Sequence, residues 1–117
     1  MLPPNSFEGK VVLVTGGGTG LGKGMVKKFS ELGAKVAIAA RRLPVLEATA
    51  AEISSETGNE ILPLQLDIRD PQAVAEVVDQ IEAKLGLPTV VVNNAAGNFI
   101  SPTERKVLAT FFLLWSS

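Results

Sequence analysis

Three residue types that serve many active sites are missing from this chain. Its 117 residues contain no cysteine, no histidine and no tyrosine. Without cysteine there are no disulfide bonds and no thiolate metal ligands, and without histidine there is no imidazole to act as a base or a ligand. The absence of tyrosine removes the phenol as a proton donor. We therefore expect no metal site, and any reaction at this chain has to use other groups.

The chain also lacks a concentrated charge of one sign and a long apolar run. Its formal net charge is −1 and no basic block is present, which argues against nucleic acid or an anionic membrane surface as a partner. The apolar residues 107–115 are too few for a membrane span, which needs about 20. Residues 1–7 have neither a cationic stretch nor an apolar core, so they predict no signal or transit peptide. A small molecule is the expected ligand of a single domain.

Apolar runs and helical stripes alternate along the chain. The run Val-Val-Leu-Val-Thr at residues 11–15 predicts a buried strand that leads into a glycine-rich loop. Further strands are expected at residues 35–40, 61–67 and 89–93, with Pro63 indicating an edge position for the third strand. Helices are expected between them, ending at Gly33, Gly58 and Gly86. In the first helix Leu21, Met25, Phe29 and Leu32 fall on one face.

The region after the fourth strand is expected to be a loop over residues 94–99, followed by a helix. Ser-Pro-Thr-Glu at residues 101–104 is a capping box with proline at the first helical position. The alternation of strands and helices predicts an open parallel sheet with right-handed crossovers. In such a sheet the ligand lies beyond the carboxyl ends of the strands. The glycine loop, Arg41, Asp67 and residues 94–99 should all lie at that edge.

The glycine loop predicts phosphate binding at the start of a helix. Residues 15–22 read Thr-Gly-x-x-x-Gly-x-Gly, and no window in the loop matches the Gly-x-Gly-x-x-Gly dinucleotide fingerprint. The loop does not match the phosphate-binding motif of nucleoside triphosphatases either, because Gly24 occupies the position where that motif has Ser or Thr to bind Mg²⁺. A glycine-rich turn without a ligand remains as the alternative.

Three charged residues after the second and third strands suggest nucleotide contacts. Arg41 stands where an acid would bind the ribose 2′-hydroxyl of NAD, and a guanidinium there suits the 2′-phosphate of NADP. Asp67 can accept a hydrogen bond from an adenine amino group, and Arg69 offers charge to an anionic part of a substrate. The alternatives are a solvated pair at Arg41 and Arg42, and a surface salt bridge with a helix cap near Asp67.

The small and amide-bearing residues 93–98, Asn-Asn-Ala-Ala-Gly-Asn, would let the backbone approach a cofactor ring. Phe99 follows them, either as a wall facing a substrate or as part of the core. Residues 15–22 and 93–97 together resemble the short-chain dehydrogenase/reductase family. Within it, residues 15–24 and 93–105, with an extra alanine in the Asn-Asn-Ala-Gly motif, and the opening residues 2–7 are most similar to the mitochondrial dienoyl-CoA reductases. The peroxisomal relatives share residues 95–99 but are a poorer match at both ends.

The resemblance implies a Rossmann-like α/β fold with a three-layer parallel sheet, of which this chain would hold the N-terminal half with strand order 3-2-1-4. Residues 1–105 would form the NADP-binding portion and residues 106–117 a divergent apolar tail. The strand at residues 89–93 would then be an open edge, which is an aggregation hazard that a helix in the tail could mask.

The resemblance also implies the ligands and their contacts. NADP would be held by Gly16, Gly17, Gly18, Thr19, Gly20, Leu21, Arg41 and Asp67. An acyl-CoA substrate, 2,4-dienoyl-CoA, would be held by Arg41, Arg69 and Phe99. No catalytic residue is assigned, because the Tyr-x-x-x-Lys segment of the family is absent.

The expected activity of the family members is the NADPH-dependent reduction of 2,4-dienoyl-CoA in the β-oxidation of unsaturated fatty acids. This chain is expected to be a truncated or alternatively spliced form without activity of its own. The alternatives are an inactive fragment that binds NADP or CoA, a non-functional product, and another NADP-dependent short-chain reductase. The resemblance implies a mitochondrial location and homo-oligomers for full-length members, and the lack of a transit peptide leaves the cytosol open for this form.

Overall fold

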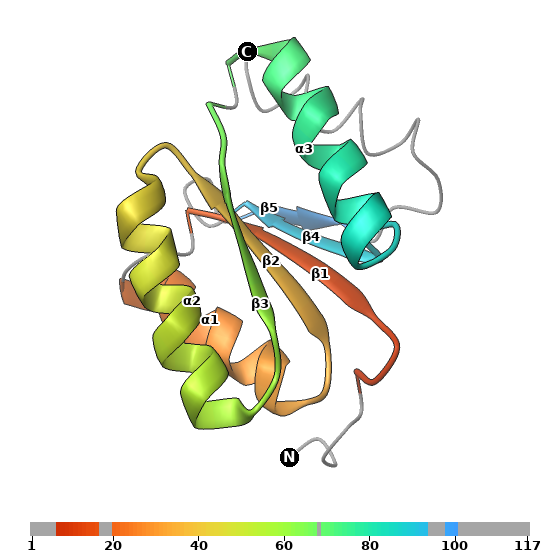
Figure 1. The fold of residues 1–117 in the computed structure, drawn as a ribbon. Helices are drawn as coiled ribbons and strands as arrows, with labels where there is room; N and C mark the ends of the chain where they lie inside the picture. Colours follow the sequence, from red (N-terminus) through yellow and green to blue (C-terminus); the bar gives the residue numbers. More distant parts are fainter. Residues whose placement is uncertain (1–6, 17–19, 68, 94–97, 101–117) are drawn as a thin grey trace.

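The computed structural model describes residues 7–16, 20–67, 69–93 and 98–100. Strands and helices alternate along most of this length (Figure 1). The elements in chain order are β1 (Val11–Thr15), α1 (Gly20–Glu31), β2 (Lys35–Ala40), α2 (Leu43–Thr57), β3 (Ile61–Gln65), α3 (Pro71–Lys84), β4 (Val90–Asn93) and β5 (Asn98–Ile100).

The strands form one sheet in the order β3-β2-β1-β4-β5. The first four strands are parallel, with Thr15 of β1 opposite Ala39 of β2 on one side and Asn93 of β4 on the other. The α/β fold and the strand order 3-2-1-4 are therefore confirmed. Among the strands that the structure describes, β3 lies at the edge and pairs only with β2, so Pro63 is in an edge strand as predicted, where a missing N–H donor is tolerated.

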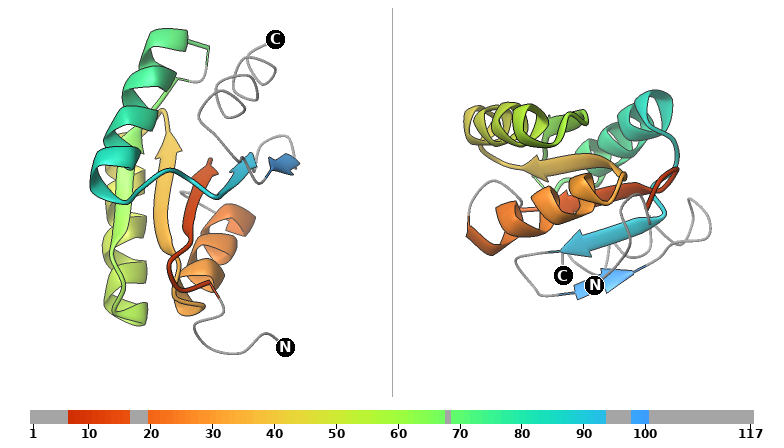
Figure 2. Two further views of the ribbon diagram at one scale, coloured as in Figure 1. Left: turned by 90° about the vertical axis from the view of Figure 1, so that its right-hand side faces the viewer. Right: turned by 90° about the horizontal axis from the view of Figure 1, so that it is seen from below.

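The far edge of the sheet differs from the prediction. Residues 98–100 form β5, which pairs antiparallel with β4 and places Phe99 opposite Val92. The loop expected at residues 94–99 is therefore wrong for Asn98 and Phe99, and β4 is not an open edge. Figure 2 shows β5 beside β4 at the outer end of the sheet. A strand of three residues carries too short a pattern to be recognised from its sequence.

Alternate residues of the central strands face opposite layers. Val11 and Leu13 of β1 pack in one cluster with α3, whose buried residues are Val74, Val77, Val78 and Ile81. Val12 and Val14 pack in the second cluster with α1 and α2. β1 is buried along its whole length, as a strand covered on both faces must be. The sheet is thus the middle of three layers, with α1 and α2 on one face and α3 on the other.

The starts and ends of the helices follow local signals. Asp70 caps α3, because its carboxylate accepts hydrogen bonds from the backbone N–H groups of Gln72 and Ala73, and Pro71 is the first helical residue. Gly33, Gly58 and Gly86 have positive φ angles where the chain turns back after each helix.

The buried face of α1 is displaced from the predicted one. Val26 and Ser30 are fully buried, whereas Met25 and Phe29 are only partly covered. Leu32, just after the helix, is buried as expected. The helix expected from residue 101 and the tail at residues 106–117 lie outside the described residues. Within the part of the chain that is described, no helix is long and apolar enough to cross a membrane.

Candidate functional site

The turn after β1 is fastened to both neighbouring strands. The N–H of Gly16 donates to the carbonyl oxygen of Ala39 in β2 over 2.8 Å, and the Thr15 hydroxyl donates to the carbonyl oxygen of Val92 in β4 over 3.4 Å. Gly16 has a φ of 71°, a conformation that glycine adopts without strain. The chain then enters α1 at Gly20. β1 thus ends at a turn whose path depends on glycine, immediately before a helix N-terminus.

The N-terminus of α1 is suited to an anion. Helix N-termini present backbone N–H groups that lack partners within the helix, together with the positive end of the helix dipole. The first turn of α1 contains no acidic residue that would repel a phosphate. The expected contacts Gly17, Gly18 and Thr19 lie outside the described residues, while Gly20 and Leu21 are the first two residues of α1. The contact of this turn with the diphosphate of a dinucleotide stays a prediction.

Arg41 follows β2 at the same edge of the sheet. The pairing of β2 with β3 continues past Ala40, whose carbonyl oxygen accepts a 2.8 Å hydrogen bond from the N–H of Leu66. The side-chain amide of Gln65 donates to the carbonyl oxygen of Arg41 over 3.2 Å. The backbone of Arg41 is therefore held, whereas its side chain is exposed. No hydrogen bond or ion pair joins its guanidinium to another described residue.

Asp67 and Arg69 form a bidentate pair after β3. Nε of Arg69 lies 3.0 Å from Oδ1 of Asp67, and Nη2 lies 3.0 Å from Oδ2. The backbone N–H of Arg69 also donates to Oδ1 over 3.0 Å. These hydrogen bonds from Arg69 lower the pKa of the Asp67 carboxyl to about 2, with a smaller electrostatic contribution from Arg41. Arg41 and Asp67 are thus close enough to affect each other electrostatically.

The structure brings Gly16, Arg41 and Asp67 to the carboxyl edge of the sheet as predicted, and Arg69 lies there because it is paired with Asp67. Phe99 is in β5, where its backbone lies opposite Val92, one residue before the end of β4. Its contact with a substrate stays a prediction. The surface salt bridge that was the alternative for Asp67 and Arg69 is present, and it does not exclude a ligand, because both side chains remain partly exposed, at 41% and 68%.

Two residues at this edge were not predicted as parts of the site. Thr15 ties the ends of β1 and β4 together through its hydroxyl, and Gln65 holds the carbonyl oxygen of Arg41. A polar residue at the last position of an otherwise apolar strand was the available signal in both cases. The sequence alone does not identify either residue as part of the site, because it does not show which strands are neighbours.

The groups at this edge are able to bind anions and to accept hydrogen bonds from a base. Guanidinium groups and a helix N-terminus bind phosphates, and an ionised carboxylate accepts hydrogen bonds from a base. Among the described residues there is no group of three acidic, cysteine or histidine side chains that could hold a metal ion.

The family model described as "short chain dehydrogenase" matches residues 10–111. An uncharacterised oxidoreductase of Caenorhabditis elegans is 61% identical over 105 residues, which are 89% of this chain and 34% of that protein. A probable 2,4-dienoyl-CoA reductase 3 of the same organism is 53% identical over 106 residues, with 90% and 34% covered. The peroxisomal 2,4-dienoyl-CoA reductase of Pongo abelii is 37% identical, with 85% and 34% covered. The chain thus spans about a third of the length of these relatives.

Solved structures agree with the fold. The citronellol catabolism dehydrogenase of Pseudomonas aeruginosa is 29% identical, with a TM-score of 0.77 over 99% of this chain and 52% of that one. A metagenomic short-chain oxidoreductase in complex with NADP is 32% identical, with a TM-score of 0.69 over 74% of this chain and 39% of that one.

The relatives do not support the mitochondrial part of the resemblance, since the organelle named for the relative from Pongo abelii is the peroxisome. The family itself is established by a match that covers most of the chain. This chain belongs to the short-chain dehydrogenase family.

Proposed function

We propose that these residues form the NADPH-binding part of a 2,4-dienoyl-CoA reductase. The observation that carries the proposal is the position of Arg41. Its backbone is fixed at the carboxyl end of β2, beside the glycine turn of β1, and its guanidinium is exposed and without a described hydrogen-bond partner. A guanidinium in this place suits the 2′-phosphate that distinguishes NADP from NAD.

The residues around Arg41 support NADP over NAD. Ala39 and Ala40, the last residues of β2, carry no carboxylate that would bind a ribose 2′-hydroxyl and repel a 2′-phosphate. A solved relative, the metagenomic short-chain oxidoreductase, is in complex with NADP. We expect Gly16 to Leu21 to hold the diphosphate and Asp67 to accept a hydrogen bond from the adenine amino group.

The substrate part of the proposal is supported by the names of relatives and by the remaining cationic group. Two of the relatives described above are named 2,4-dienoyl-CoA reductases. Arg69 is mostly exposed at the same edge, and a guanidinium suits the phosphates of coenzyme A. We expect Arg41, Arg69 and Phe99 to contact the acyl-CoA. When bound, NADPH would supply a hydride to the dienoyl chain.

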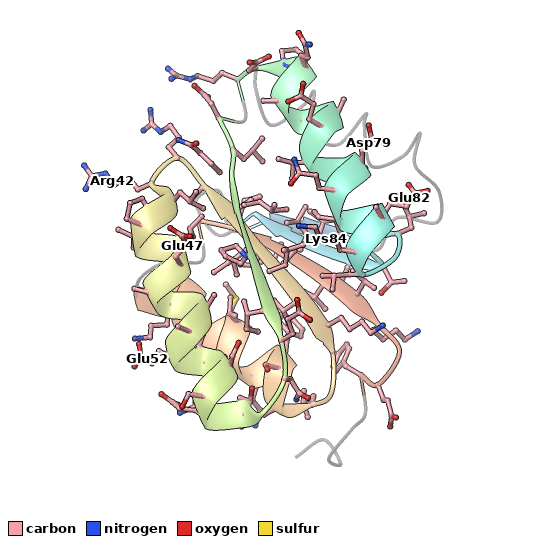
Figure 3. The ribbon with its side chains drawn as sticks, viewed as in Figure 1. Arg42, Glu47, Glu52, Asp79, Glu82 and Lys84 are labelled. Atoms are coloured by element: carbon pink, nitrogen blue, oxygen red, sulfur yellow. The ribbon has the colours of Figure 1, made fainter. Side chains whose placement is uncertain are left out.

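The cofactor proposal is tested by thermal unfolding of the purified chain with NADPH and with NADH. A ligand that binds only the folded state raises the unfolding midpoint. We expect a larger rise with NADPH, a loss of that difference in Arg41→Ala, and its retention in the matched control Arg42→Ala. Figure 3 shows the Arg42 side chain at the start of α2, extending away from the ribbon. Equal shifts with both nucleotides in the wild type would contradict the role given to Arg41.

The second candidate is binding without catalysis by this chain. The 117 residues contain no tyrosine, and the family's Tyr-x-x-x-Lys segment would have to provide the proton donor. We expect purified chain to show no oxidation of NADPH that depends on a 2,4-dienoyl-CoA. Such oxidation would favour a self-sufficient enzyme, whereas a midpoint shift without turnover would favour a binding module.

The cellular location stays a prediction. The mitochondrion follows only from the resemblance of residues 2–7, 15–24 and 93–105, while the name of one relative includes the peroxisome. Fractionation of cells that express the tagged protein, with markers for mitochondria, peroxisomes and cytosol, decides between them.

A further inference from the structure

The contacts of Arg69 fill particular positions on the Asp67 carboxylate. An ionised carboxylate offers about two acceptor positions on each oxygen. Oδ1 of Asp67 accepts two hydrogen bonds, one from the backbone N–H of Arg69 and one from its Nε. Oδ2 accepts one hydrogen bond, from Nη2. Among the contacts of the described residues, the acceptor position that remains is on Oδ2.

These contacts also fix the direction in which Oδ2 points. Two parallel hydrogen bonds from one planar guanidinium set the plane of the carboxylate, and the bond from the backbone N–H ties Oδ1 to the main chain. An exposed aspartate without such partners rotates among several conformers, and ordering it on binding costs affinity. Arg69 therefore prepares one acceptor position of Asp67 before a ligand arrives.

We propose that Arg69 is a positioning residue that gives the nucleotide site its preference for adenine by aiming Oδ2 of Asp67 at the amino group of the base. This inference rests on the proposed function, because it takes Asp67 as the acceptor for the base. It assigns to Arg69 a role toward the cofactor, in addition to the predicted contact with acyl-CoA.

The two roles of Arg69 use different parts of its guanidinium. Nε and one N–H of Nη2 are engaged by Asp67, whereas Nη1 makes no hydrogen bond to any residue that the structure describes. The side chain of Arg69 is 68% exposed, so it is open to a second partner. An anionic group can bind at Nη1 while the pair with Asp67 stays intact.

Substitution of Arg69 separates the orientation of Asp67 from its charge. The pKa of Asp67 is lowered to about 2 from its ordinary 3.8. Removal of Arg69 returns this pKa toward the ordinary value, so Asp67 remains ionised at pH 7. Any change in the preference for adenine at pH 7 then reflects the direction of the carboxylate.

The test compares NADPH with its hypoxanthine analogue, in which a carbonyl oxygen replaces the amino group of adenine. Dissociation constants of both nucleotides are measured by calorimetry at pH 7 for wild-type chain. Loss of one hydrogen bond to a charged acceptor changes affinity by about tenfold. We expect wild type to prefer NADPH by about that factor, because the analogue turns an acceptor toward Oδ2.

The variants are Arg69→Ala, Arg69→Lys, Asp67→Asn and the control Arg42→Ala. We expect Arg69→Ala to bind both nucleotides equally, Arg69→Lys to keep part of the preference, and Arg42→Ala to keep all of it. Asp67→Asn should also lose the preference. A uniform weakening toward both nucleotides in Arg69→Ala, with the preference retained, would show only a general charge effect and would overturn the inference. A cooperative unfolding transition without ligand confirms that each variant folds, and Arg69→Lys keeps a cation at this position.

The outcomes for wild type separate this inference from the proposed function. Binding of both nucleotides with equal affinity would leave NADP binding in place and overturn the role of Asp67 and Arg69. Binding of neither nucleotide would overturn the proposed function and the inference together.

Discussion

The N–H of Gly16 is hydrogen-bonded to the carbonyl oxygen of Ala39, two residues before Arg41. This single backbone contact of 2.8 Å joins the glycine turn of β1 to the end of β2. The glycine turn, where we expect the diphosphate, and Arg41, where we expect the 2′-phosphate, are therefore fixed relative to each other by the sheet. The backbone thus sets the spacing of the two proposed contacts with one dinucleotide.

Gly16→Ala should destabilise the chain. The φ of 71° at Gly16 lies in the left-handed region, where a Cβ costs about 1–2 kcal/mol. Gly24→Ala is the matched control, since Gly24 is an exposed residue inside α1 with open space where a Cβ would be added. Alanine there should stabilise the chain by about 0.5–1 kcal/mol. Urea unfolding of both variants measures the two effects, and changes of the same sign would contradict this prediction.

Thr57→Val should weaken the connection between α1 and α2. The Thr57 hydroxyl lies 2.7 Å from the hydroxyl of fully buried Ser30, and it donates to the carbonyl oxygen of Ile53 over 2.9 Å. It also accepts from the N–H of Asn59 over 3.2 Å. Valine keeps the volume but leaves these groups without their partner, at an expected cost of about 1–3 kcal/mol.

The control for Thr57 is Ser55→Ala, which changes an exposed hydroxyl of the same helix. We expect its free energy of unfolding to stay within about 0.5 kcal/mol of wild type. Urea midpoints compared at one pH provide the measurement. Equal losses in Ser55→Ala and Thr57→Val would mean that the hydrogen bonds of Thr57 do not stabilise the fold.

The Asp67–Arg69 pair should make stability depend on acidic pH. The pKa of Asp67 is about 2 in the folded chain against an ordinary 3.8. A carboxyl with a lowered pKa contributes stability that is fully present above its ordinary pKa and is lost as the pH falls through the lower one. The contribution should therefore persist at pH 5 and decline between about pH 4 and pH 2.

The chemical shift of the Asp67 carboxyl carbon, followed by NMR as the pH is changed, measures the pKa of this carboxyl in the folded chain. We expect a midpoint near 2 in wild type and a midpoint closer to 3.8 in Arg69→Ala. The same midpoint in both proteins would argue against the bidentate pair in solution. Arg42→Ala, which leaves the pair intact, should titrate like wild type.

Proline in β5 should test whether this strand protects β4. Successive N–H groups of an antiparallel strand point alternately toward and away from the neighbouring strand. Of Phe99→Pro and Ile100→Pro, one removes a hydrogen bond to β4 and the other serves as its control. We expect the variant that loses this hydrogen bond to expose the edge of β4 and to promote self-association, which sedimentation measures. Identical behaviour of the two variants would contradict a protective role.

The order of the elements is determined by the sequence itself. Short apolar runs rich in β-branched residues and bounded by glycine or polar residues favour buried strands, and the stripe of Val74, Val77, Val78 and Ile81 favours a helix with one buried face. Glycines and prolines mark where each element begins or ends. Alternation of strands and helices with right-handed crossovers predicts a parallel sheet and places Arg41 and Asp67 at one edge. The order 3-2-1-4 is expected from the family resemblance and is observed.

The tertiary structure alone decided which groups meet. Val26 rather than Met25 is fully buried in α1, because the rotation of a helix is set by the surface beneath it. β5 forms because the backbone of β4 pairs with it, and a segment of three residues is too short to show a strand pattern in its sequence. The hydroxyls of Ser30 and Thr57 meet across 27 positions of sequence. The orientation of the Asp67 carboxylate likewise depends on side-chain geometry, which the spacing of residues in the sequence does not determine.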